Sequence, residues 1–272
     1  MKAIFISDAH LRKAGDERYK KLLKFFDAVQ AGHVMTAADP GAKSGRTLID
    51  HLYIAGDLFD FWFCPKEKIN PEFKPVIDKL NEMKNSGIGL HLCEGNHDFF
   101  MRDYFADVLG LDVAEEFMEA RLDHLNVLIA HGDTADSTNS NYLMLRKILR
   151  SNVFYNFQRF IPASVRWSLA GLFSTASKEL TTEDGNALVK KMEPFALNKF
   201  QEGFDAVILG HCHVPAINSY DVDGRKRTFV TLGDWITHYS FVYYENNNFF
   251  IHRYRGFPIS GCCLQTTDRS GR

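Results

Sequence analysis

The chain has 272 residues, of which 45% are hydrophobic, 24% charged and 13% aromatic. This composition supports a sizeable core and excludes collagen-like, low-complexity and intrinsically disordered chains. The 32 basic and 34 acidic side chains leave a formal charge of −2, which argues against a protein that holds nucleic acid on a broad basic face.

Neither a membrane anchor nor an export signal is evident. No apolar run reaches the roughly 18 residues of a membrane-spanning helix, and the N-terminal segment, acidic at Asp8, does not resemble a secretory signal. The five cysteines form no C-x-x-C pair, which favours reduced thiols over a disulfide framework. We therefore expect a soluble, cytoplasmic protein.

Short apolar, β-branched runs recur along the chain, and each ends at a Gly, Asp or His. Such runs predict buried strands over 3–6, 52–55, 88–93, 127–130 and 206–209. Helical spacing predicts helices over 19–29 and 76–84. Alternation predicts antiparallel strands over 228–232, 239–245 and 249–254, the last two joined at 246–248. The pattern indicates an α/β sandwich with a mixed sheet.

One segment differs from the rest, because residues 137–178 contain no Asp or Glu but several basic and aromatic side chains. Leu145, Ile148 and Leu149 recur at helical spacing. We predict a helical cap over 135–202, inserted into one discontinuous core domain made of 1–134 and 203–260. Residues 261–272 should form a loose tail.

Polar side chains stand where the predicted strands end. The carboxyl ends of strands in an α/β sheet lie along one crevice, where ligands bind. Five strand ends therefore bring the following side chains to one edge: Asp8, His10, Asp57, Asn96, His131, His211 and His213. Glycines and other small neighbours allow the backbone to turn tightly there.

These carboxylate, amide and imidazole groups suit Mn, Fe, Zn or Co better than calcium, which prefers oxygen ligands. Seven ligands are too many for one ion but fit two ions that share a bridging carboxylate. Two divalent ions about 3.5–4 Å apart recur in phosphoester hydrolysis, where they activate water and neutralise charge. Phosphate-loop and dinucleotide-binding motifs are absent from the sequence.

The ordered blocks D-x-H, GD-x-x-D, GNHD, HGD and GH-x-H resemble the calcineurin-like metallophosphoesterase superfamily over about residues 5–213. The resemblance implies a four-layer αββα sandwich with mixed sheets and an inserted helical cap. It also implies that Asp8, His10, Asp57 and His213 hold one ion. Asp57 would bridge to the second ion, which Asn96, His131 and His211 would also hold.

The same resemblance gives catalytic roles to His97 and Asp60. His97 would stand beside the scissile phosphate, as a phosphate clamp or as the acid for the leaving oxygen, and the Asp60 carboxylate would orient it. A carboxylate against one imidazole nitrogen fixes the tautomer and favours the cation. The alternative is that Asp60 caps a helix and His97 is a solvated neighbour.

A narrower resemblance is to bacterial UDP-2,3-diacylglucosamine hydrolases, carried by ISDAHL, GDLFDFW, HGDT and the Ser177-Lys178-Glu179 triplet. It implies cleavage of a pyrophosphate in lipid A synthesis, to UMP and a diacylated glucosamine 1-phosphate, usually with manganese. Apolar stripes of the cap would sheathe acyl chains, and its basic residues would meet phosphates and the inner membrane. The candidate substrate-binding residues are Tyr142, Arg146, Arg150, Ser177 and Lys178.

Other functions stay open. The main branch of that enzyme family usually has Arg where this chain has His97, so a metallophosphatase or phosphodiesterase acting on a soluble nucleotide or phosphoprotein is the first alternative. A non-catalytic, membrane-associated scaffold is a second, and a nuclease is remote because no phosphate track is evident. We infer no nucleic acid and no protein partner. Trp62 lines the pocket mouth or fills the core, Cys212 is a packing thiol, and His252 is a surface or packing residue.

Overall fold

The structure is a computed structural model, and it describes residues 1–33, 47–62, 69–158 and 184–256. Its strands form two sheets. The six-stranded sheet has the order β11 (Asn248–Arg253), β10 (Ser240–Glu245), β1 (Lys2–Ile6), β2 (His51–Ala55), β3 (Gly89–Cys93) and β4 (Asp112–Ala114). The five-stranded sheet has the order β5 (Phe117–Leu122), β6 (Leu125–Ala130), β7 (Ala206–Leu209), β9 (Arg225–Leu232) and β8 (Pro215–Val222).

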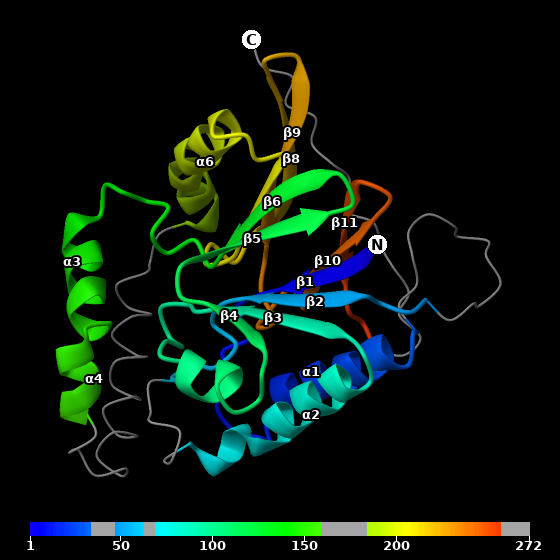
Figure 1. Cartoon of the computed structure of the whole chain (residues 1–272), viewed down its shortest axis with the longest axis vertical. Coiled ribbons are helices and arrows are strands. Elements are labelled where there is room, and N and C mark those ends of the chain that lie inside the picture. Colours follow the sequence, from blue (N-terminus) through cyan, green and yellow to red (C-terminus); the bar gives the residue numbers. More distant parts are fainter. Residues whose placement is uncertain (34–46, 63–68, 159–183, 257–272) are drawn as a thin grey trace.

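Helices cover the outer face of each sheet. Figure 1 shows α1 (Glu17–Gln30) and α2 (Lys74–Asn85) on one side and α6 (Gly185–Gln201) on the other, with the two sheets between them. Two short turns, η2 (Pro71–Phe73) and η3 (Arg102–Ala106), complete the first helical layer. The order helix, sheet, sheet, helix confirms the predicted four-layer sandwich with mixed sheets.

The buried strands are apolar on both faces because a helical layer covers one face of each sheet and the second sheet covers the other face. In β1, Ile4 and Ile6 pack towards the helices, whereas Phe5 packs between the sheets, stacked on Tyr53 of β2 at 4.8 Å. Alternate strand residues point to opposite faces, so a strand between two apolar layers has no polar side. The all-apolar runs were therefore a reliable signal for β1, β2, β6 and β7.

The C-terminal hairpin forms where the sequence indicates it. Glu245 pairs with Asn248, so the loop between β10 and β11 consists of Asn246 and Asn247 alone. Both have positive φ, 52° and 61°, as a type I′ turn requires. Asparagine tolerates this conformation better than other non-glycine residues, and β10 then pairs antiparallel with β1.

The predicted cap interval needs a correction at its end. Within 135–202 the structure describes α3 (Ser140–Leu149) and α4 (Asn152–Gln158), which lie along one side of the sandwich, and α6, which belongs to the core (Figure 1). Met192 and Phe200 of α6 are buried against Val207 of β7, so α6 is the fourth layer. Residues 159–183, including Ser177 and Lys178, and the predicted tail over 261–272 lie outside the described residues.

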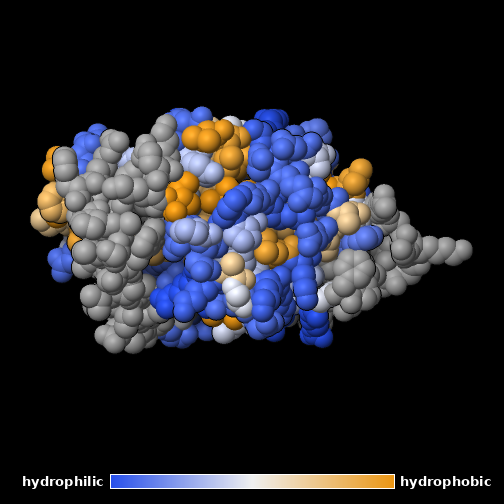
Figure 2. All heavy atoms as spheres, turned by 90° about the horizontal axis from the view of Figure 1, so that it is seen from below, coloured by the Kyte–Doolittle hydropathy of each residue, from blue (hydrophilic) through white to orange (hydrophobic). Residues whose placement is uncertain are grey.

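The face on which α1 and α2 lie is mostly hydrophilic (Figure 2). Among the described residues, no helix combines the length and the apolar character needed to cross a bilayer.

Candidate metal centre

The structure brings all seven predicted ligands together at one end of the sandwich. Asp8 and His10 follow β1, Asp57 follows β2, and Asn96 comes after β3. The remaining three come from the second sheet, where His131 follows β6 and His211 and His213 follow β7. The sequence analysis placed these side chains at one edge of a single sheet. In the structure they come from two sheets, whose strands have their carboxyl ends close together.

Asp57 stands at the middle of the cluster. Its Oδ2 lies 3.5 Å from Nε2 of His10 and 3.4 Å from Nε2 of His131. On the first side, Oδ1 of Asp8 lies 3.3 Å from Nε2 of His213. This is the position that a carboxylate bridging two ions would occupy.

The second side of the cluster is built around His131. Its Nε2 lies 2.8 Å from Oδ1 of Asn96 and 3.2 Å from Nδ1 of His211. Its Nδ1 lies 3.1 Å from the carbonyl oxygen of Ala55. Because a carbonyl only accepts, Nδ1 carries the proton and Nε2 presents its lone pair to the cluster.

The chemistry of the central atoms fits divalent cations. Asp8 and His131 are fully buried, and His10 is 4% exposed. Within the described residues, Oδ1 of Asp8 and both ring nitrogens of His10 form no hydrogen bond of standard geometry, only contacts of 3.3–3.9 Å with acids and imidazoles of the same cluster. A buried polar atom left without a hydrogen bond costs up to about 1–3 kcal/mol, and coordination of a cation would offset that cost here. Ligand atoms lie within 4.8 Å of one another in three groups: Asp8–His10–His213, Asp8–Asp57–His131 and His10–Asp60–His97.

The backbone is strained where these side chains leave the strands. Five ligands have positive φ: Asp8 at 56°, His10 at 45°, Asp57 at 52°, His211 at 65° and His213 at 58°. The left-handed region is uncommon for residues other than glycine, and such strain costs on the order of 1–3 kcal/mol at each position. Its concentration in one cluster indicates a functional site rather than ordinary packing.

Asp98, the acid of the GNHD block, has a supporting role that the sequence analysis did not assign. It is fully buried and accepts hydrogen bonds from the backbone nitrogens of Asp57, at 2.9 Å, and Gly95, at 2.8 Å. It thereby ties the loop after β2 to the loop after β3. A side chain at Gly95 would overlap Oδ1 of Asp57, so glycine is required for this approach.

Burial and crowding set the protonation of the cluster. Burial raises the pKa of Asp57 well above its ordinary value, and the charges of Asp98 and Asp8 add to this rise. Burial acts on Asp8 in the same direction, but His213 and the other imidazoles hold the pKa of Asp8 below its usual range. Burial also lowers the pKa of His211 to about 4. Neutral imidazole is the form that binds a metal.

The predicted pairing of His97 with the Asp60 carboxylate is corrected by the structure. Nδ1 of His97 lies 2.9 Å from the backbone carbonyl oxygen of Asp60. The Asp60 carboxylate instead accepts a hydrogen bond from Nε of Arg12 and lies 3.5 Å from Nδ1 of His10. The guanidinium therefore competes successfully for this carboxylate. Burial and the nearby His10 lower the pKa of His97 to about 3, so this imidazole is neutral near pH 7.

Three predicted substrate-binding residues of the cap donate hydrogen bonds to carboxylates of the core. Oη of Tyr142 and Nε of Arg146 donate to the same oxygen of Asp133, at 2.6 and 2.7 Å. Arg150 donates to a carboxylate oxygen of Glu94 at 2.9 Å. Sequence reasoning missed Asp133 and Glu94, although Asp133 was visible as the acid of the HGD block.

Two ambiguous residues prove to be packing residues. Trp62 is fully buried among Phe59, Phe73 and Phe105, so it fills the core rather than lining a pocket mouth. Cys212 is 3% exposed, and its Sγ lies 3.7 Å from the carbonyl oxygen of Val214.

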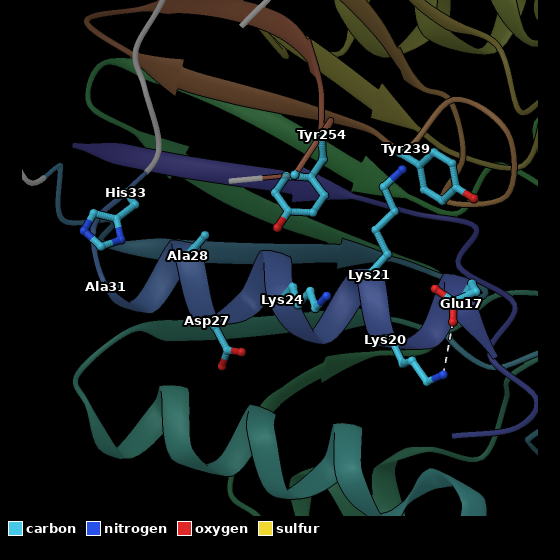
Figure 3. Close-up of a pocket in the computed structure, with 11 residues that line it drawn as sticks. Glu17, Lys20, Lys21, Lys24, Asp27, Ala28, Ala31, His33, Tyr239 and Tyr254 are labelled. Carbon is cyan, nitrogen blue, oxygen red and sulfur yellow. Dashed lines mark hydrogen bonds and ion pairs between the residues drawn. The ribbon is translucent and has the colours of Figure 1, made fainter. Parts of the chain in front are cut away.

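A hollow of about 800 Å³ lies away from the cluster, between α1 and the C-terminal end of the described chain (Figure 3). Lys21 lies over the ring of Tyr239 at 3.3 Å, and Lys20 pairs with Glu17. None of the seven ligands is among the described residues that line this hollow.

Two sheets between helical layers, with carboxylates and imidazoles gathered at the strand ends, define a metal-dependent hydrolase. The family described as calcineurin-like phosphoesterase matches residues 1–215. The match covers most of the chain and all five strand-end blocks, and the chain therefore belongs to the calcineurin-like phosphoesterases, whose site is binuclear.

Two similar curated proteins carry the same name. UDP-2,3-diacylglucosamine hydrolase of Pseudomonas entomophila is 28% identical over 234 residues, which cover 85% of this chain and 90% of that protein. The enzyme of the same name from Proteus mirabilis is 27% identical over 238 residues, covering 87% and 92%. Among solved structures, a Vps29 double mutant from Entamoeba histolytica has 14% identity and a TM-score of 0.44, covering 97% of this chain and 98% of its own.

Proposed function

We propose that this phosphoesterase hydrolyses the pyrophosphate bond of UDP-2,3-diacylglucosamine to UMP and a diacylated glucosamine 1-phosphate, a step of lipid A synthesis. The reaction would take place at the cytoplasmic face of the inner membrane and use two manganese ions. The observation that carries the hydrolytic part is the convergence of the seven donors around Asp57. The named relatives, similar over most of their length, support the substrate.

The ligand groups fit the two ions as follows. Asp8, His10, Asp57 and His213 would hold the first, and Asp57, Asn96, His131 and His211 the second. When bound, such a pair supplies a water of lowered pKa and neutralises charge on the phosphate. The protein then contributes orientation, since strained backbone and buried carboxylates such as Asp98 hold the donors in place.

His97 places a ring nitrogen that can gain and donate a proton beside this centre. Its Nδ1 is fixed by the carbonyl of Asp60, and its ring lies edge-on to that of His10, 4.8 Å away. With Nδ1 protonated, Nε2 is the atom that can gain a proton next to an anionic phosphate and donate it. We propose that His97 steadies the phosphate or protonates the leaving oxygen through Nε2.

The cap favours a lipid substrate over a soluble one. Residues 137–158, which include α3 and α4 of the cap, contain no Asp or Glu. Five large apolar side chains of α3 and α4 are more than half exposed: Met144, Leu145, Ile148, Val153 and Phe157. An apolar patch without acids suits acyl chains and an anionic bilayer surface.

The test is incubation of the purified protein with UDP-2,3-diacylglucosamine and Mn²⁺, with UMP as the measured product. We expect UMP release that Asp57→Ala abolishes. A soluble phosphoester is the second candidate, favoured by His97 at the position where the relatives' family usually has arginine. Turnover of a generic phosphodiester without UMP release would replace the first proposal by the second. Hydrolysis retained in Asp57→Ala would contradict both.

A further inference from the structure

We propose that Arg150, at the C-terminus of α3, is a positioning residue for the second metal site, which it holds through Glu94 and the carbonyl of Gly95. This inference rests on the proposed two-metal function and deepens it. It assigns the cap a role in building the metal centre, in addition to any role in holding substrate.

Arg150 makes three hydrogen bonds, two to the start of the loop after β3 and one to the loop between β4 and β5. One terminal nitrogen donates to Oε2 of Glu94 at 2.9 Å and to the carbonyl of Glu115 at 2.8 Å. The other donates to the carbonyl of Gly95 at 2.6 Å. The guanidinium also lies 5.4 Å from the ring centre of Phe99. Only the planar fork of arginine reaches several acceptors at fixed angles in this way.

The loop that Arg150 grips carries Asn96. Gly95 directly precedes Asn96, whose Oδ1 lies 2.8 Å from Nε2 of His131. On its other side the loop is fixed to the loop after β2, because Asp98 accepts from the nitrogen of Asp57 and Oδ1 of Asp57 accepts from the nitrogen of His97. Arg150 therefore supplies the outer of two opposed clamps on this loop.

Glu94 is a buried carboxylate whose charge is paired with Arg150. It is 3% exposed, its Oε2 meets Arg150, and its Oε1 accepts from the backbone nitrogen of Met101 at 2.6 Å. A buried carboxylate without a partner is strongly unfavourable. Arg150 is itself only 13% exposed, so the pair is enclosed rather than a surface ion pair of small consequence.

The same face of α3 reaches the loop of His131. Tyr142, Arg146 and Arg150 are spaced by four residues, which places them in one row on a helix. The first two end on Asp133, two residues after His131. One row of the cap helix thus hydrogen-bonds to two of the loops that carry ligands of the second site, those of Asn96 and His131.

The decisive variant is Arg150→Lys, which keeps the charge for Glu94 but cannot make the three hydrogen bonds together. We expect calorimetric titration with Mn²⁺ to show one of the two sites losing at least tenfold in affinity, with the other unchanged within about twofold. Excess Mn²⁺ should restore kcat towards bis(p-nitrophenyl) phosphate, and KM for that ester should stay within about twofold. Lys147→Ala, an exposed residue of the same helix, is the matched control and should behave as wild type.

A second variant separates positioning from general stability. Glu94→Gln keeps the acceptor for Met101 and removes the charge that Arg150 meets, so it should weaken the same site, and its effect should not add to that of Arg150→Lys. Unchanged Mn²⁺ affinity in both variants, with a higher KM for the UDP-linked lipid, would make Arg150 a substrate contact and overturn the proposal. If the wild type binds two Mn²⁺ but hydrolyses no phosphoester, the proposed function fails while the titration still decides the role of Arg150.

Discussion

At the scale of single residues, the metal centre combines strained backbone with buried like charges. Asp57 shows both, since its φ is 52° and burial together with Asp98 and Asp8 raises its pKa. Positions of this kind reduce the stability of a fold and persist where function requires them. Cation binding would offset the repulsion between Asp57 and Asp8.

The variant Asp57→Asn should therefore stabilise the protein when chelator removes metal, while it abolishes metal-dependent hydrolysis. The amide keeps the acceptor for the nitrogen of His97 and removes one buried charge. We expect a gain of about 1–3 kcal/mol in the free energy of unfolding, measured by urea denaturation with EDTA. A loss of stability under these conditions would contradict the described electrostatics.

Substitutions of His97 and Asp60 should affect different quantities, kcat in the first case and Mn²⁺ affinity in the second. Since His97 is outside the seven ligands, His97→Asn should lower kcat about a hundredfold, equivalent to about 2.7 kcal/mol, and leave Mn²⁺ affinity unchanged. Asp60→Asn should leave the hydrogen bond of His97 intact, because that bond ends on the backbone. It should weaken Mn²⁺ binding instead, through His10. Equal losses of kcat in both variants, with unchanged metal affinity, would favour the carboxylate dyad that the sequence suggested.

At the scale of elements, strands that are buried on both faces were predicted from the sequence, whereas three half-exposed strands were not. Strands covered on both faces, such as β1 and β7, were found from the sequence because every residue is apolar except Lys2 at the start of β1. Three strands were not predicted: β4, β5 and β8. Buried and exposed positions mix along β5, and β8 begins with Pro215 and includes Asn218 and Asp221. Half-exposed edge strands carry little signal beyond alternation, so their position depends on tertiary packing.

The strand β11 contains a buried titratable group away from the metal centre. His252 is 1% exposed, stacks on Phe241, and has no hydrogen-bond partner for either ring nitrogen within the described residues. Burial lowers its pKa to about 4. A group with a depressed pKa of this sign binds protons better when unfolded, so its neutral form supports the fold above about pH 6.5 and loses that support as the pH falls towards 4.

His252→Phe should remove this pH sensitivity. Between pH 7 and pH 4 the wild type should lose roughly 3 kcal/mol more than the variant in the free energy of unfolding, at most. Urea denaturation at both pH values measures the difference. His124→Phe changes an exposed histidine in the turn after β5 and serves as control. Parallel pH profiles of wild type and His252→Phe would show that His252 is not buried as described.

At the scale of the whole molecule, the sequence predicted which residues meet but not how they are held. The ordered blocks identified the seven side chains that converge, since acids and histidines directly after buried strands are brought together by the fold itself. The contact of Arg150 with Glu94 joins residues 56 positions apart and has no local signal. Neither the contribution of two sheets nor the place of α6 in the core could be derived from periodicity alone.

The central claim is that Asp57 is shared by two bound cations. Calorimetric titration of the metal-free protein with Mn²⁺ tests it most directly, with metal content of the dialysed protein measured in parallel. We predict two ions per chain for the wild type and severe weakening of both sites in Asp57→Asn. Two sites of unchanged affinity in Asp57→Asn, or a single site in the wild type, would contradict the account.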